Sequence, residues 1–98
     1  MNASHTSFDR ATTHLFDAIE TLGVAEFNLF VMSIGDFVDQ DEHNTFIATL
    51  NKVRANLTSL HPLLADNKEY IPSYKGCWGR LIKLQVEYKN QSYYDGVM

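Results

Sequence analysis

Apolar residues recur at steps of three and four along four stretches of the chain, the spacing of one face of an α-helix. The first predicted helix covers residues 8–22, and its apolar face consists of Phe8, Ala11, Leu15, Ala18, Ile19 and Leu22. Thr6 and Asp9 have the form of a capping box at its start. Gly23 is a typical residue just past a helix end. The pattern therefore predicts a helix that stops at Gly23.

A second helix is predicted over residues 24–38, and it is apolar nearly all round. Leu29 and Met32 add apolar surface outside its main stripe, which is formed by Phe27, Phe30, Val31, Ile34, Phe37 and Val38. A helix of this kind lies either at the centre of a core or in an interface. In a small bundle every helix should keep one polar side, so an interface is weighed here equally with plain burial.

The third predicted helix, residues 41–60, carries a heptad stripe with steps of four and three: Phe46, Leu50, Val53, Leu57 and Leu60. The repeat is too short for a free-standing coiled coil and fits antiparallel packing in a bundle. His61 precedes Pro62, and the residue before a proline disfavours the helical region. The helix should end there, with residues 61–73 as a loop tacked onto the bundle.

The fourth segment, residues 74–89, is ambiguous. A helix with Ser73 as N-cap would gather Tyr74, Cys77, Trp78, Leu81, Ile82 and Tyr88. Residues 82–89 instead alternate apolar and polar as a strand does, and residues 92–98 could complete a hairpin. We favour the helix because the rest of the chain is helical. The predicted fold is all-α: a bundle of three or four helices, with a short C-terminal β-hairpin as the alternative.

The 98-residue length predicts one domain over residues 1–98, with flexible ends at 1–6 and 92–98. The hydrophobic fraction of 45% is ordinary for a globular chain. One cysteine cannot form an internal disulfide. The N-terminus lacks the pattern of a signal peptide, and the longest apolar stretch is too short to cross a bilayer. We therefore expect a cytoplasmic protein with no membrane partner.

Charge is divided unevenly between the two halves of the chain. Residues 1–50 hold eight acidic residues and one basic residue, a net charge of −7, whereas residues 51–98 hold seven basic and four acidic residues, a net charge of +3. The two halves could simply attract each other in the fold. The other hypothesis is a negative face that docks on a basic partner, and its candidate residues are Asp36, Asp39, Asp41 and Glu42.

Metal binding is not supported by these acidic residues. A calcium loop that starts at Asp39 should have glycine at position six and glutamate at position twelve, but the chain has Asn44 and Leu50 there. The acidic run is instead typical of a turn followed by the N-terminus of a new helix. One cysteine and scattered histidines give no zinc-ligand spacing. No metal or cofactor is expected.

The stretch YKGCWGR, residues 74–80, holds the only cysteine and the only tryptophan. Cys77 lies near Lys75 and Arg80, which could lower its pKa, but no spacing brings a histidine to it as a base. Free cysteine is usually buried. We therefore interpret the stretch as a packing and contact corner and predict no catalytic residue.

The function that the sequence favours is a non-catalytic protein-binding module, an inhibitor or adaptor that docks on a larger protein and modulates it. Small motif-free chains of this type are common among phage- and plasmid-encoded regulators of host enzymes such as nucleases. Aromatic and arginine side chains anchor protein interfaces, and the candidate contacts are Tyr74, Lys75, Trp78, Arg80, Phe27, Phe30 and Tyr88.

Three alternatives stay open. The basic and aromatic C-terminal half could bind nucleic acid, although a pI near 5.4 is far from that of typical nucleic-acid-binding domains. The acidic N-terminal half could mimic DNA in the basic groove of a nuclease or repressor. The chain could also form a homodimer.

Overall fold

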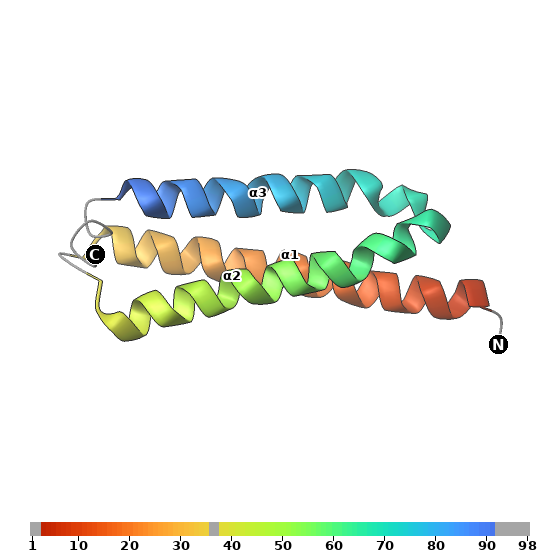
Figure 1. Cartoon of the computed structure of the whole chain (residues 1–98), viewed down its shortest axis with the longest axis horizontal. Helices are drawn as coiled ribbons and strands as arrows, with labels where there is room; N and C mark the ends of the chain where they lie inside the picture. The colour runs from red at the N-terminus through yellow and green to blue at the C-terminus, as the bar shows by residue number, and fades with distance from the viewer. Residues whose placement is uncertain (1–2, 36–37, 92–98) are drawn as a thin grey trace.

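A computed structural model describes residues 3–35 and 38–91, with the side chains of residues 3–5 left out. The elements run in the order α1 (Ala3–Ser33), α2 (Gln40–Leu60), the 3₁₀ segments η1 (His61–Asp66) and η2 (Lys68–Tyr70), and α3 (Ile71–Asn90) (Figure 1). The described residues contain no strand. The all-α prediction is confirmed.

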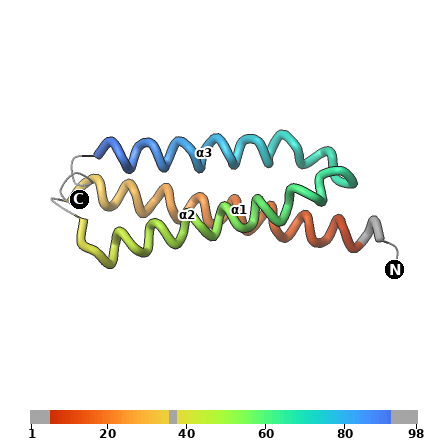
Figure 2. The backbone as a smooth tube through the Cα atoms, viewed as in Figure 1, coloured from red at the N-terminus to blue at the C-terminus, as the bar shows by residue number. Residues whose placement is uncertain are grey.

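The three α-helices in the described part of the chain form an elongated bundle with extents of 53 × 21 × 19 Å. α1 packs along both α2 and α3, and its contact with α2 is the most extensive one. Figure 2 shows α1 crossing behind α2, with η1 and η2 turning the chain at the end where α1 begins. The end of α1 therefore lies near the start of α2, at the opposite end of the bundle.

The core is built on a heptad stripe of α1 whose members are all at most 5% exposed: Ala11, Leu15, Ala18, Leu22, Ala25, Leu29 and Met32. An alanine at every seventh position lets the backbone of α2 approach closely. Opposite this stripe lie Phe46, Leu50, Val53, Leu57 and Leu60 of α2, all buried, which confirms the stripe predicted for that helix. α3 contributes Cys77, Leu81, Leu84 and Tyr88.

The predicted helix stop at Gly23 is wrong, because α1 runs through it as one helix of 31 residues. A glycine inside a helix costs about 1 kcal/mol relative to alanine. Continuing the helix buries Ala25, Leu29 and Met32 in the core, and each larger side chain gains about 1.5–3 kcal/mol from burial. The core contacts beyond Gly23 therefore outweigh its local preference. Thr6 and Asp9 lie inside α1 and do not begin it.

The continuous helix also reverses the predicted burial of the second segment. Leu29 and Met32, expected off the main stripe, are the core residues. From the stripe itself Phe27, Phe30, Val31 and Ile34 are exposed, Val38 is buried beyond the end of α1, and Phe37 lies outside the described residues.

Residues 71–90 are helical, so the helix alternative holds for 82–89, and residues 92–98 lie outside the described part of the chain. α3 begins at Ile71 with Pro72 in its first turn, so the predicted cap at Ser73 is wrong. The expected loop, residues 61–73, is two 3₁₀ segments and the first turn of α3.

Asn67 fixes this connection to the start of α1. Its side chain is 2% exposed and donates hydrogen bonds to Ser7 Oγ at 3.1 Å and to the Leu63 carbonyl at 2.7 Å. The hydroxyl groups of Thr12 and Tyr70 form a second link, 2.8 Å long. Residues 3–6, expected to be flexible, belong to the first helical turns of α1.

Candidate functional site

Seven large apolar side chains of α1 are exposed to solvent, and so is Ile34, which directly follows the helix. Phe16, Phe27, Phe30 and Ile34 are each 60% exposed or more. We define the outward face of α1 as Phe16, Ile19, Val24, Phe27, Phe30, Val31 and Ile34. Isolated exposed apolar residues are ordinary, but a contiguous group of this size on one helix is not. It is therefore the first candidate for a binding surface.

The geometry of one helix explains this surface. Phe27 follows the core residue Leu22 by five positions, which is about 140° around a helix with 3.6 residues per turn. Steps of four, three, four, three and four connect Phe16, Glu20, Gly23, Phe27, Phe30 and Ile34, so Glu20 and Gly23 interrupt the apolar positions of this stripe. α1 thus carries two heptad stripes on opposite sides, and α2 and α3 cover only the one rich in alanine and leucine.

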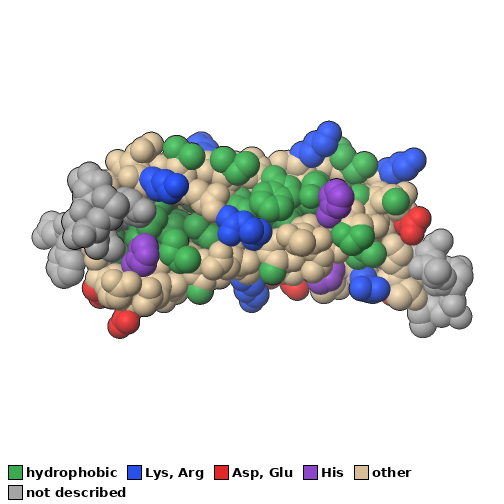
Figure 3. All heavy atoms as spheres, viewed as in Figure 1, with side chains coloured by type: hydrophobic (Ala, Val, Ile, Leu, Met, Phe, Trp, Pro, Cys, Tyr) green, Lys and Arg blue, Asp and Glu red, His purple; other side chains and the backbone are tan. Residues whose placement is uncertain are grey.

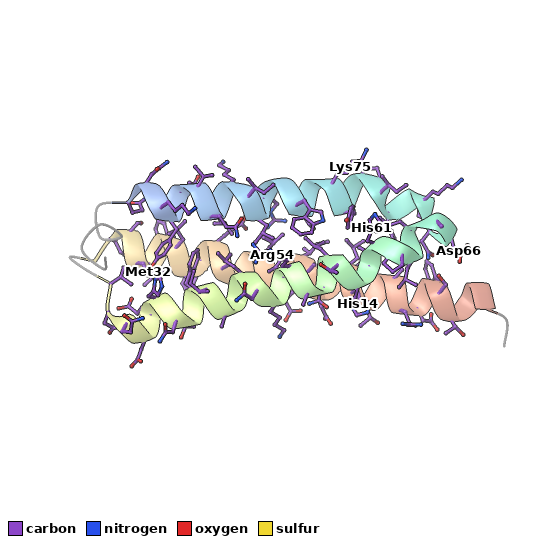
Figure 4. The ribbon with its side chains drawn as sticks, in the orientation of Figure 1. His14, Met32, Arg54, His61, Asp66 and Lys75 are labelled. Carbon is purple, nitrogen blue, oxygen red and sulfur yellow. The ribbon has the colours of Figure 1, made fainter. Side chains whose placement is uncertain are left out.

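A hollow of about 330 Å³ lies on the α2 side of the outward face, and we call it the α1–α2 hollow. Its apolar walls include Phe27, Val31 and the edge of Met32, and its other walls are Asn28, Asp39, Asp41, Glu42 and Thr45. Figure 4 shows Met32 at the end of the bundle where α1 meets the start of α2. The structure therefore brings the predicted contact Phe27 together with three residues of the predicted acidic face.

Two of these acidic residues also hold the start of α2. Asp39 is its N-cap and accepts a hydrogen bond from the Glu42 backbone N–H at 2.8 Å, and the Glu42 carboxylate accepts from the Asp39 N–H at 3.5 Å. This capping box confirms the interpretation of the acidic run as a helix start. Asp41 is exposed in the same turn. Asp36 lies outside the described residues.

A second hollow, of about 350 Å³, lies on the α3 side between Phe30 and Arg80. The Arg80 guanidinium donates to both carboxylate oxygens of Glu26, at 2.6 and 3.0 Å. This hydrogen bonding lowers the pKa of Glu26 and raises the pKa of Arg80. Arg80 is therefore held to α1, where Glu26 compensates its charge.

The YKGCWGR stretch is a packing corner in the structure. Cys77 is 3% exposed, and burial raises the pKa of its thiol, so it stays protonated near neutral pH. Tyr74 and Trp78 pack against the core, with their rings edge to face at 6.4 Å. Lys75 is exposed on α3, at the outer edge of the bundle in Figure 4.

Tyr88 is 2% exposed and belongs to the core rather than to an accessible surface. Its ring packs on Phe46 at 4.8 Å, and its hydroxyl group is hydrogen-bonded to His43 Nδ1 at 2.5 Å. It lies under a groove of about 470 Å³ between α2 and α3, where Ile47, Ile82 and Val86 are exposed. Figure 3 shows hydrophobic side chains gathered along this join.

Sequence reasoning put Phe27, Phe30, Val31 and Ile34 on one stripe and named Phe27 and Phe30 as contacts, but it missed Phe16, Ile19 and Val24 as members of the same surface. The sequence contains these residues as a second stripe with heptad spacing, on the side of the helix away from the first stripe. This second stripe was hidden because Gly23 was interpreted as a helix stop, which separated Phe16 from Phe27.

Among residues 6–35 and 38–91, no three His, Cys, Asp or Glu side chains gather closely enough to hold a metal ion. No described helix combines the length and apolar character needed to cross a membrane. Comparison with protein-family models, with curated proteins and with solved structures found no match. The surface of the molecule is therefore the basis of any functional proposal.

Proposed function

We propose that the protein is a non-catalytic binding module that docks on a larger protein through the outward face of α1 and modulates that protein. The observation that carries the proposal is the exposure of six large apolar side chains of α1, and of Ile34 next to its end, away from the side of the helix that fills the core. Aromatic anchors at the centre of an apolar patch supply much of the free energy of typical protein interfaces.

The size of the patch supports this function. At about 200 Å² for a whole aromatic side chain, Phe16, Phe27 and Phe30 expose roughly 370 Å² together, and the full outward face exposes on the order of 600 Å². The largest patch on a typical monomer is about 300–600 Å². A standard interface buries about 800 Å² on each partner. The outward face with its rim therefore approaches the size of one side of a stable interface.

The arrangement of the basic residues makes the nucleic-acid alternative weaker. Arg80 is paired with Glu26, Lys83 lies 4.0 Å from Glu87, and Trp78 is half-buried against the core. Stacking on bases needs an accessible aromatic ring beside free cations. Our hypothesis for the target is a host enzyme such as a nuclease. The identity of the target stays a prediction, and so does the cytoplasmic location.

Affinity capture with matched variants tests this proposal. The tagged protein, the double variant Phe27→Ala/Phe30→Ala and the control Ile82→Ala/Val86→Ala are incubated with nuclease-treated lysate of the source cells. The control removes two side chains of similar exposure from the groove between α2 and α3. We expect one stoichiometric protein with the wild type and the control, and its loss with Phe27→Ala/Phe30→Ala. Equal capture by all three proteins, or capture of nucleic acid only, would contradict the proposal.

A further inference from the structure

The outward face of α1 has the spacing that a second helix recognises. Resting on the function proposed above, we infer that its occupant is an amphipathic helix of a different protein, with an apolar stripe in heptad spacing and Lys or Arg along one flank. Residues 16 to 34 span about 27 Å of helix, so the occupant needs about 18 residues in five turns. Two helices with the same heptad repeat pack knobs into holes along such a seam.

Gly23 supports the close approach of a helix. It lies within the outward stripe, between Phe16 and Phe27, and is exposed. A side chain there would meet nothing within 4 Å, so no packing inside the molecule requires a glycine. A glycine inside a helix still costs about 1 kcal/mol relative to alanine. A partner helix accounts for this position, because a gap beside Phe27 admits a large side chain of the partner.

The acidic residues around the α1–α2 hollow indicate that the partner helix is positively charged on that side. On the α2 side, Asp39, Asp41 and Glu42 line the α1–α2 hollow. Asp17 is exposed and lies on the same flank of α1, because it precedes Asn28 by 11 residues, which is close to three whole turns. No base pairs with Asp17 or Asp41 among the described residues. A lysine or arginine on the partner would meet these carboxylates at the rim of the seam.

The same charges argue against a second copy as the occupant. Arg10 is the only base of α1, whereas Asp17 and Glu20 lie along the helix that would be shared. Each copy carries a net charge of −4. Charge complementarity therefore selects a basic helix of another protein, since like charges across a contact suppress association.

Two designed peptides test the inference directly. Each has three heptads with Leu at a and d, and one has Lys and the other Glu at e and g. We expect the wild type to bind the Lys peptide roughly fivefold or more tightly at low salt, as two exposed ion pairs allow. The preference should shrink at high salt. The double variant Asp17→Asn/Asp41→Asn should lose this preference. The control Asp66→Asn/Glu69→Gln makes an equal change of charge in η1 and η2, at the end of the bundle where Figure 4 shows Asp66, and should keep the preference.

Three outcomes would overturn the inference. Equal affinity for both peptides would show that the partner helix does not need basic residues along its flank. Binding that survives Phe27→Ala/Phe30→Ala would show that the partner helix does not bind along the outward face. A dimer in sedimentation equilibrium that this double variant dissociates would make a second copy the occupant. The function proposed above is tested separately: a protein captured through Phe27 and Phe30 that contacts α1 with a strand or loop would reject the helix and retain the binding module.

Discussion

The register of α1 can be tested by truncating two neighbouring side chains to the same residue. Leu29 is 5% exposed in the core, whereas Phe27 is 65% exposed on the outward face. Leu29→Ala should lower the free energy of unfolding by about 3 kcal/mol, because it removes buried methyl groups and leaves a cavity. Phe27→Ala removes a side chain that is one-third buried, so its loss should be at most about 1 kcal/mol. The higher helix propensity of alanine partly offsets that loss.

Urea unfolding followed by circular dichroism measures both changes. With a slope of about 1.5 kcal/mol per molar urea, Leu29→Ala should lower the midpoint by about 2 M, and Phe27→Ala should shift it by less than about 0.7 M. A domain of this size has about 5–15 kcal/mol of stability, so both variants should remain folded in water. If Phe27→Ala were as destabilising as Leu29→Ala, the phenylalanine stripe would face the core and the outward face would not exist.

Three further measurements test other parts of the structure. Gly23→Ala should raise the free energy of unfolding by up to about 1 kcal/mol, because the new methyl group meets open space, and an unchanged or lower urea midpoint would contradict the helix through Gly23. Arg80 lowers the pKa of Glu26 in the folded state, so the stabilisation from this pair is present above the unfolded-state pKa, about 4.3, and is lost as the pH falls through the lower folded-state value. In the variant Glu26→Gln the free energy of unfolding should therefore fall less steeply as the pH is lowered into the acid range. An unchanged pH dependence would show that the pair is not formed. Cys77 should react with a thiol reagent roughly tenfold or more slowly in the native protein than in urea, and equal rates would contradict its burial.

The helical class and the whole of α2 could be predicted from the sequence. Phe46, Leu50 and Val53 belong to one heptad stripe, and no competing stripe runs beside it. The acidic run at Asp39 identified the start of this helix, since a capping box is made by residues three apart. These features depend on neighbours in the chain, so the sequence alone contains the information that decides them.

The orientation of the second half of α1 was decided only by the tertiary structure, whereas the pattern of residues 8–22 already predicted Ala18 and Leu22 on the buried face. Its two stripes have the same heptad spacing, and the one with phenylalanine has the larger side chains but is interrupted by Glu20 and Gly23. The stripe with Ala18, Leu22 and Ala25 is buried instead, because small side chains let α2 approach closely along the whole helix. That gain comes from a helix remote in sequence, so the local pattern of residues 24–38 did not reveal which of their apolar side chains are buried. The same choice left Phe27 and Phe30 in solvent and created the candidate binding surface.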